Sequence, residues 1–469
     1  MTSHWTRRKI LGAGVASIGA AAIHVPALAQ GGPWHGTDWY PLQVPDTTPP
    51  ALPLLDCAPA MVNMGDGKLR RVLAYNGKFP GPTWVARPGD RVTTRLRNGT
   101  GEPTITHWHG LIVNPANDGG PQSAIAPGQT YDYDFPIIQR AGLNFYHAHP
   151  DLLTGKQVCL GLAGAFIVRD SEEDALGLPG GAYEVPLVIR DASFDSAGNL
   201  AYNPTSSGFK GKFPLVNGTL NPRLAVARGV YRFRVLNGSN ARMFRLALST
   251  GASFRIIGND GGLLEHPATV SEVLLSMGER LDILVDFGAL AAGQSITLQC
   301  RDARWNLLQF VGTGNAGMAY TPPANLSYIA PLSGPDVPTR TFTFDGMSRI
   351  NGQMYEMGRI DFNVPFGVTE RWRFKTGGNA PSGPRARRQL PGGFAQRRPR
   401  QALSLGRRLE GHRAAQRQGN GGRTDPVRGL PGPVRSPLPP AGARERRHDE
   451  QFPGHLVQAH LRPGRPCWT

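Results

Sequence analysis

Two pairs of histidines in the first third of the chain have the spacing of a metal site. The segment THWHGL contains His107 and His109, and the segment NFYHAHPD contains His147 and His149. On an extended strand, side chains two residues apart leave the same face about 6.6 Å apart. Imidazole nitrogen binds copper and zinc well, so each pair suits neighbouring metal ions. A single pair is more often a polar strand face or a hydrogen-bonded turn, but the recurrence beside aromatic residues favours metal binding.

The elements that must position these histidines are short strands separated by turns. The 469 residues include 60 glycines and 42 prolines, more than the usual shares of about 7% and 5%, which favours turn-rich β structure. Strand patterns recur as LRRVLAYNG, DRVTTRLRNGT, HGLIV, YDYDFPI and GLAGAFIVRD, and again in two later blocks. The predicted fold class is all-β, with each block forming a Greek-key β-sandwich. The predicted domains are residues 45–172, 180–325 and 338–381, the last being incomplete.

The N-terminus has the pattern of an export signal. Arg7 and Arg8 precede a mildly apolar segment rich in glycine and alanine, and ALA at residues 27–29 supplies a small-residue cleavage pattern. Residues 1–29 are therefore predicted to be a twin-arginine signal, and the protein is expected in the periplasm or otherwise outside the cytoplasm. After this segment, no apolar run is long enough to span a bilayer.

The strong positive charge lies mainly in one segment. The chain has a formal net charge of +17, but residues 382–469 alone contain 18 arginines, no lysine and only five acidic residues. Residues 30–381 contain 30 basic and 29 acidic side chains and are nearly neutral. The predicted folded part therefore lacks the basic surface that nucleic-acid binding requires, and no nucleic-acid partner is expected.

Several segments together resemble the three-domain multicopper oxidases. These are HWHGL with NDGGPQ, YHAHPDLLTGKQ with GLAGAFIV, LVNGTLNP, GNDGGLLEHP, and INGQMYEMGRIDF with ERWRF. The resemblance extends over about residues 65–381. It implies three cupredoxin-like domains, a type 1 copper that takes electrons from a donor, and a trinuclear copper cluster that reduces dioxygen to water. In this family the cluster is held by eight histidines in four HxH motifs.

The resemblance also assigns roles to individual residues. His107 corresponds to a ligand of the type 2 copper, and His109, His147 and His149 correspond to ligands of the type 3 pair. Asp118, in NDGGPQ, resembles the family's outer-sphere carboxylate that supplies protons while dioxygen is cleaved. From the residues alone, Asp118 is equally well explained as a turn residue before two glycines.

The remaining copper ligands of the family are absent from this reading of the gene. The motifs HPxHxHG and HCHxxxHxxxxM, which supply four cluster histidines and the type 1 ligands, do not occur. With suitable synonymous codons, however, the DNA for SGPRARRQL (382–390), read from the second base of the Pro381 codon, encodes HPVHVHGAS. The same displacement converts SPLPPAGARERRHD (436–449) into LHCHRLEHESVGMM. We therefore predict a one-base insertion or two-base deletion near Pro381, in the gene or its sequencing.

Several functions stay open at this point. With residues 382–469 out of frame and disordered, the oxidase would be defective, because half of its cluster ligands and all type 1 ligands are missing. The alternative is a copper-free periplasmic cupredoxin-fold scaffold, like division-associated relatives that have lost the histidine pairs. A basic tail that binds nucleic acid is disfavoured because it lacks lysine and interleaved aromatic residues.

The electron donor cannot be assigned from the sequence. The partners expected are dioxygen and either a small organic molecule or a metal ion. Met347, Met354 and Met357 are soft ligands that would suit cuprous ion, although ordinary packing is the favoured explanation. The cysteines are too few and too scattered for a disulfide to be assigned, and the oligomeric state is left open.

Overall fold

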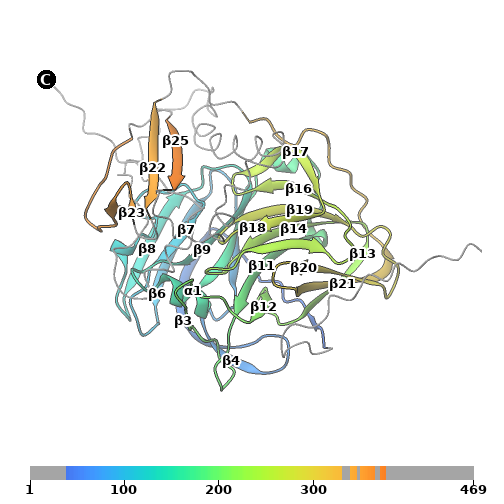
Figure 1. Ribbon diagram of the computed structural model, residues 1–469, viewed down its shortest axis with the longest axis horizontal. Helices are drawn as coiled ribbons and strands as arrows, with labels where there is room; N and C mark the ends of the chain where they lie inside the picture. The colour runs from blue at the N-terminus through green and yellow to red at the C-terminus, as the bar shows by residue number, and fades with distance from the viewer. Residues whose placement is uncertain (1–37, 330–337, 346–348, 365–369, 377–469) are drawn as a thin grey trace, which may run out of the picture.

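The described part of the chain consists of two complete β-sandwiches and a smaller sheet (Figure 1). A computed structural model describes residues 38–329, 338–345, 349–364 and 370–376. The predicted export signal and the predicted out-of-frame segment lie outside these ranges. Strands dominate, so the all-β prediction is confirmed. No helix among the described residues is long and apolar enough to cross a membrane.

The first sandwich holds both histidine pairs. Its two sheets have the strand orders β4-β3-β6-β8 and β2-β5-β10-β9-β7. The strands are β2 (Thr47–Thr48), β3 (Ala51–Asn63), β4 (Leu69–Tyr75), β5 (Gly81–Ala86), β6 (Arg91–Asn98), β7 (Thr106–His109), β8 (Thr130–Pro136), β9 (Gly142–Ala148) and β10 (Ala163–Val168). Strand β6 alternates strictly between exposed and buried residues, as DRVTTRLRNGT predicts, because one face packs on the core. The buried side chains of both sheets form one core.

The second sandwich is formed by twelve strands. Its sheets have the orders β12-β11-β14-β19-β16-β17 and β1-β13-β21-β20-β15-β18. The strands are β1 (Tyr40–Pro41), β11 (Glu184–Ala192), β12 (Phe213–Val216), β13 (Pro222–Arg228), β14 (Val230–Asn237), β15 (Phe244–Leu248), β16 (Phe254–Asn259), β17 (Gly262–Val270), β18 (Glu272–Leu275), β19 (Arg280–Asp286), β20 (Ser295–Cys300) and β21 (Trp305–Ala316). Strands β11 and β14 are buried almost throughout, and their side chains join a large apolar core shared by both sheets.

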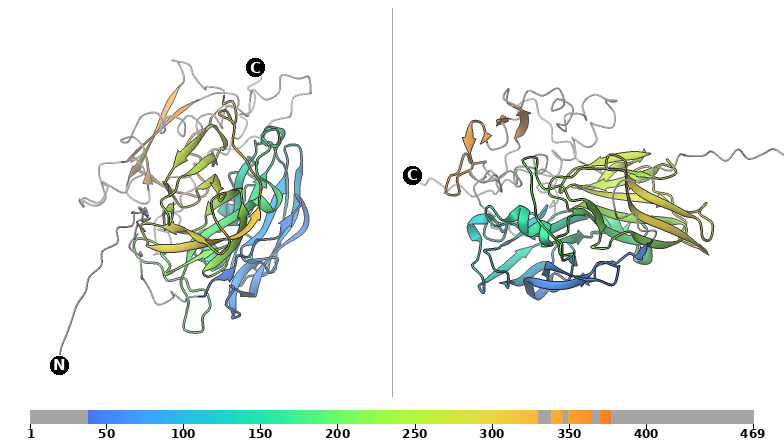
Figure 2. Two further views of the ribbon diagram at one scale, coloured as in Figure 1. Left: turned by 90° about the vertical axis from the view of Figure 1, so that its right-hand side faces the viewer. Right: turned by 60° about the horizontal axis from the view of Figure 1, so that its bottom comes forward.

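The third sheet, coloured orange in Figures 1 and 2, has the strand order β24-β23-β22-β25. Its strands are β22 (Thr339–Asp345), β23 (Arg349–Ile350), β24 (Gln353–Met354) and β25 (Arg371–Thr376). An aromatic cluster joins Phe342 with Phe362, Trp372 and Phe374. The segment IDFNVPFG (360–367) has the apolar pattern of a strand, but its described part, 360–364, contains no strand.

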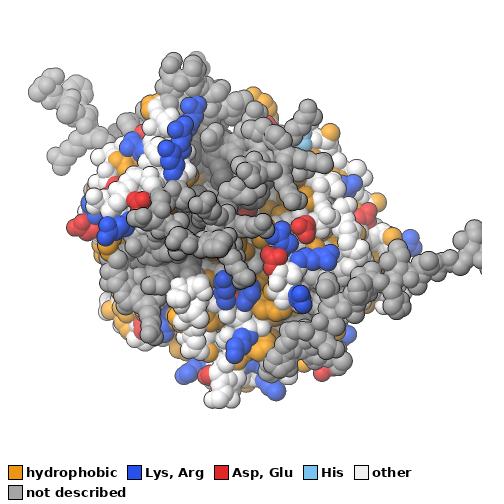
Figure 3. All heavy atoms as spheres, viewed as in Figure 1, with side chains coloured by type: hydrophobic (Ala, Val, Ile, Leu, Met, Phe, Trp, Pro, Cys, Tyr) orange, Lys and Arg blue, Asp and Glu red, His pale blue; other side chains and the backbone are white. Residues whose placement is uncertain are grey.

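Among the residues that the structure describes, helical structure is confined to short connections. Helix α1 (Thr154–Leu160) follows the second histidine pair, and α2 (Ser171–Asp174) follows the first sandwich. The 3-10 turns are η1 (Pro121–Ser123) and η2 (Gly181–Tyr183). On the face shown in Figure 3, basic and acidic side chains of the described residues are intermingled, in keeping with the nearly neutral charge of residues 30–381.

The two sandwiches share a buried contact. Leu143, Phe145, Ala165 and Ile167 of the first sandwich pack against Val188 and Leu236 of the second. Beside them, Arg232 and Arg234 of β14 are almost fully buried and pair with Glu173, Glu184 and Asp282. The pKa values of Glu173 and Glu184 are both lowered. Burial alone would raise them, but the charges of the two arginines outweigh burial. The strand β9, with one histidine pair at its end, thus lies directly at the contact between the sandwiches.

Candidate metal centre

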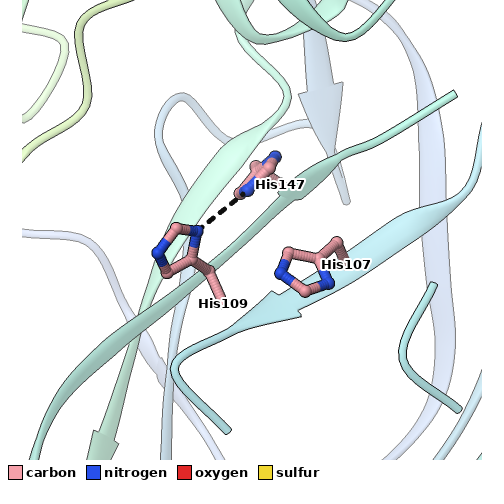
Figure 4. Close-up of side chains that lie close together, drawn as sticks. All are labelled: His107, His109 and His147. Atoms are coloured by element: carbon pink, nitrogen blue, oxygen red, sulfur yellow. Dashed lines mark hydrogen bonds between the residues drawn. The ribbon is translucent and has the colours of Figure 1, made fainter. Parts of the chain in front are cut away.

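The antiparallel pairing of β7 with β9 brings the predicted histidines together. His107 lies directly opposite His147, and His109 lies opposite Phe145. The ligand nitrogens of His107, His109 and His147 all lie within 4.8 Å of one another. Figure 4 shows the three side chains gathered beside the two strands. His149, one residue past the end of β9, has its ring centre 5.3 Å from that of His107 and 5.7 Å from that of His147. The structure therefore gathers all four predicted side chains.

The opposite face of these strands fixes their register. Trp108 pairs with Tyr146 across β7 and β9, and both side chains are fully buried. Trp108 packs edge-on against Trp84 and Phe166, with ring centres 5.4 and 6.2 Å away. A slip of one residue would exchange the two faces of a strand. It would drive the histidines into the apolar core, so the buried aromatic residues keep the imidazoles on the outer face.

Tyr133, which the sequence did not single out, holds β7 in place through hydrogen bonds. The Tyr133 hydroxyl donates a hydrogen bond to the Thr106 carbonyl at 2.7 Å and accepts one from the Thr106 amide at 3.0 Å. The Tyr75 hydroxyl contacts Thr106 Oγ1 at 2.9 Å. Burial raises the pKa of Tyr133 well above its usual value, so its hydroxyl keeps the proton that it donates. Thr106, the residue before His107, is thereby held at its amide, its carbonyl and its hydroxyl.

The strand prediction for HGLIV is wrong beyond His109. Strand β7 ends there, and Gly110 has a φ of +90°, which favours glycine. A Cβ atom at Gly110 would lie only 2.4 Å from Asn144 Oδ1. The apolar residues after it lie in irregular structure, so apolar character alone did not distinguish the end of the strand.

Backbone carbonyls set the protonation of two imidazoles. His107 Nδ1 lies 2.7 Å from the Asp118 carbonyl oxygen, and His147 Nδ1 lies 2.9 Å from the Ala148 carbonyl oxygen. A carbonyl oxygen only accepts, so both Nδ1 atoms carry a proton, and in the neutral imidazole Nε2 keeps its lone pair. His147 Nε2 lies 3.4 Å from His109 Nδ1. Two nitrogen ligands about 2.0 Å from one ion are about 3.3 Å apart at a tetrahedral angle, so this pair fits a shared ion.

The electrostatics of the two paired histidines differ. Burial lowers the pKa of His147 well below its usual range, and neighbouring His107 and His149 lower it further. His147 is therefore neutral near pH 7, the form that binds metal ions. Burial also lowers the pKa of His107, but the charge of Asp118 and its hydrogen bonds outweigh burial and raise this pKa. Asp118 Oδ1 lies 3.4 Å from His107 Nδ1, which places the predicted carboxylate at the centre.

We expect Asp118→Asn to lower the pKa of His107, because the amide removes the charge that raises it. The raised pKa stabilises the fold fully below the unfolded value of 6.5, and this contribution is lost as the pH rises through the folded pKa. The variant should therefore lose more unfolding free energy in acid than in alkaline solution. Titrating the His107 ring protons by NMR, with denaturation at several pH values, measures both effects.

The control for this prediction is Asp132→Asn. That carboxylate is exposed and pairs with Arg95 between strands β8 and β6, in the sheet that does not carry the histidines. This variant should leave the titration of His107 unchanged. An unchanged His107 titration in Asp118→Asn would contradict the role given to the Asp118 charge.

The donor set suits copper. The residues at the centre offer imidazole nitrogen, which binds copper, zinc, iron and nickel, and none of the three buried cysteines Cys57, Cys159 and Cys300 belongs to the histidine group. The Phe145 ring stacks on His109 with ring centres 4.2 Å apart and lies 5.1 Å from the ring centre of His147. An apolar wall of this kind limits the access of water to bound metal.

The fold and the centre together define a protein of tandem β-sandwiches, with a histidine cluster on the outer face of the first. The family model described as multicopper oxidase matches residues 56–173. A variant of the McoA multicopper oxidase from Aquifex aeolicus has a similar crystal structure, with a TM-score of 0.67 and 35% identity over 72% of this chain and 82% of that chain. The chain belongs to the multicopper oxidase family, and its sandwiches are of the cupredoxin type.

Two kinds of curated relative are similar to this chain. The multicopper oxidase mco of Staphylococcus haemolyticus is 33% identical over 308 residues, which are 65% of this chain and 65% of that protein. The chain thus covers a little less than two thirds of that relative's length. The cell division protein FtsP of Salmonella typhimurium is 30% identical over 397 residues, covering 78% of this chain and 82% of that protein.

Proposed function

We propose that the gene encodes an exported copper-dependent oxidase, which couples one-electron oxidation of a donor to the four-electron reduction of dioxygen to water. The observation that carries this proposal is the cluster of imidazoles that β7 and β9 place on one face. The twin-arginine pattern at Arg7 and Arg8 supports export. The sequence domains 45–172, 180–325 and 338–381 would be its three cupredoxin-like domains.

Four residues would hold copper in this half of the centre. His107 would serve the type 2 ion, and His109, His147 and His149 would serve the type 3 pair. Bound copper would supply one-electron steps and a binding place for dioxygen. The protein's own contribution is orientation: the carbonyls of Asp118 and Ala148 hold the imidazole Nδ1 protons. Each Nε2 lone pair is thereby left for the metal.

Asp118 would act on protons. Its carboxylate is buried, with 3% of its surface exposed, and lies beside the His107 ring. In that position it would hold a proton close to the place where dioxygen is reduced. The turn formed by Asp118 and Gly119 brings this carboxylate there, so the structural and the catalytic explanations of Asp118 describe the same geometry.

The chain in its present reading would be a defective oxidase. It carries four cluster histidines, whereas the partner motifs appear only when the DNA beyond Pro381 is read one base later. The electron donor would be a small organic molecule or a metal ion. Met354 and the partly exposed Met357 lie in the third sheet region, but neither decides between these donors.

Copper titration tests the half-centre directly. The full chain is expected to bind Cu(II), and His147→Gln is expected to weaken binding at least about tenfold, since even residues that only orient a ligand change affinity 10–100-fold. His266→Gln is the matched control, because His266 is exposed and its Nδ1 hydrogen-bonds the Ala324 carbonyl, outside the histidine group. Isothermal titration calorimetry on the metal-free protein measures both. Equal affinities for wild type and His147→Gln would refute the assignment.

A copper-free scaffold of the cell envelope is the second candidate function. The observation in its favour is the similarity to FtsP, a cell division protein, over 82% of that protein. A scaffold needs its folded surface but not its imidazoles. A wild-type chain that folds yet binds no copper, together with unchanged cell division in a His147→Gln strain and impaired division in a deletion strain, would support the scaffold and contradict the oxidase.

A further inference from the structure

Strand β9 connects the second sandwich to the histidines. Leu143 and Phe145 point to the same side of β9 as His147, and both pack in the apolar contact with Val188 and Leu236 of the second sandwich. Strand β9 also contacts β14, β16, β17 and β19. The second sandwich therefore contacts the side chains of β9 that directly precede His147, and through them it can affect the metal centre.

A buried arginine of the second sandwich is attached to this part of β9. Arg280, the first residue of β19, has only 1% of its surface exposed. Its Nε donates to the Leu143 carbonyl at 3.1 Å, and its Nη1 donates to the Gly278 carbonyl at 3.0 Å. Nη1 also lies 3.1 Å from Asp260 Oδ1, an ion pair that compensates the buried charge. The guanidinium is thus fixed from both sandwiches at once.

The same guanidinium lies against Phe145 and the end of β7. Its central carbon is 5.9 Å from the Phe145 ring centre, within the range of a cation–π contact. A Cβ atom at Gly110, directly after His109, would come within 2.8 Å of Arg280 Nη2. Phe145 in turn lies nearly parallel to the rings of His109 and His147, with interplanar angles of 26° and 25°. Phe145 therefore lies between Arg280 and both imidazoles.

We propose that Arg280 is a positioning residue for the metal centre, holding Phe145 and the end of β9 so that His109 and His147 stay stacked against Phe145 and directed at one ion. This inference rests on the proposed copper function for its ligand, but the positioning itself concerns only residues of this chain. The planar guanidinium bonds three carbonyls and contacts one carboxylate. A lysine ammonium keeps the charge but lacks that fixed geometry, so Arg280→Lys separates the two properties.

The experiment compares Arg280→Lys with Arg232→Lys in the full-length chain. Arg232 is the matched control, because it is also buried at the contact between the sandwiches and pairs with Glu173 and Asp282. Two readouts are taken. NMR of the metal-free protein records the His109 ring protons, which the stacked Phe145 ring shields. Calorimetry and electron paramagnetic resonance then record the affinity and spectrum of Cu(II).

Arg280→Lys is expected to move the His109 ring protons downfield and to weaken Cu(II) binding about tenfold or more, with an altered copper spectrum. Arg232→Lys is expected to lower stability while leaving both readouts as in wild type. Asp260→Asn, which weakens the ion pair to Arg280 from the less buried side, should produce a smaller change of the same kind. It supplies the test if Arg280→Lys does not fold.

His109 resonances that stay unchanged in Arg280→Lys and Asp260→Asn would overturn the positioning role. If the His109 resonances shift in the two variants but the wild-type protein binds no copper, the positioning role is supported and the proposed copper function is contradicted. The two failures are therefore distinguishable.

Discussion

A gene from which one base is removed beside the codon for Pro381 is expected to encode a blue protein that consumes oxygen, whereas the chain in its present reading is expected to consume little or none. The displaced reading supplies HPVHVHG and HCHRLEHESVGM. It therefore adds four cluster histidines to the four that the structure gathers on β7 and β9. The cysteine, histidine and methionine of these motifs are the ligands of a blue copper site. An oxygen electrode, with a phenol, an aromatic amine or Cu(I) as the donor, measures the difference.

Two controls make this result specific. Removing two bases at the same place yields the third reading frame, which should give neither blue colour nor oxygen consumption. Replacing the cysteine of the HCH motif with serine in the restored gene should abolish the blue absorbance while the four described histidines still bind copper. Oxygen consumption by the chain in its present reading, at the rate of the restored protein, would contradict the frameshift hypothesis.

The core of the centre could be predicted because it depends on local spacing. The HxH pattern requires both side chains of a pair on one face of a strand, and β7 places His107 and His109 in that way. The position of His147 opposite His107 depends on register. That register is set by Trp108 and Tyr146 on the other face, and a histidine motif alone does not contain it.

The supporting residues could not be predicted because they act over long sequence distances. The alternation of YDYDFPI predicts that Tyr133 points inward, but nothing in it predicts the bonds to Thr106. Likewise, Arg280 lies 137 residues from Leu143, which it bonds. Such contacts exist only once the sheets and sandwiches have packed.

Strand β3 shows a different limit of sequence reasoning. It lies between β4 and β6, yet the first predicted strand is LRRVLAYNG, which begins at Leu69. Pro53 and Pro59 give the β3 segment a pattern that disfavours strand structure. Pro53 falls where the pairing of β3 with β6 shifts register between Ala51 and Leu54. Pro59 lies beyond Cys57, the last residue of β3 that pairs with β6. Each proline therefore occupies a bulge or a one-sided position, where its missing amide proton is tolerated.

Gly119→Ala is expected to be the most damaging single substitution near the centre. Gly119 has a φ of +73°, and an added Cβ would lie 1.8 Å from the Thr106 carbonyl oxygen and 2.8 Å from His107 Cα. The left-handed backbone costs an alanine about 1–2 kcal/mol, and the overlap costs about 1–3 kcal/mol more. Relief of the overlap must move Asp118 away from β7, which breaks the bond between its carbonyl and His107 Nδ1.

Gly128→Ala separates backbone strain from displacement. Gly128 has nearly the same backbone, with a φ of +81°, but an added Cβ meets nothing within 4 Å. Urea denaturation followed by tryptophan fluorescence should show a loss of about 1–2 kcal/mol for Gly128→Ala and a clearly larger loss for Gly119→Ala. Cu(II) affinity should fall about 10–100-fold in Gly119→Ala alone, because only there does the imidazole of His107 lose its orienting carbonyl. Equal losses in both variants would show that the turn at Asp118 does not orient His107.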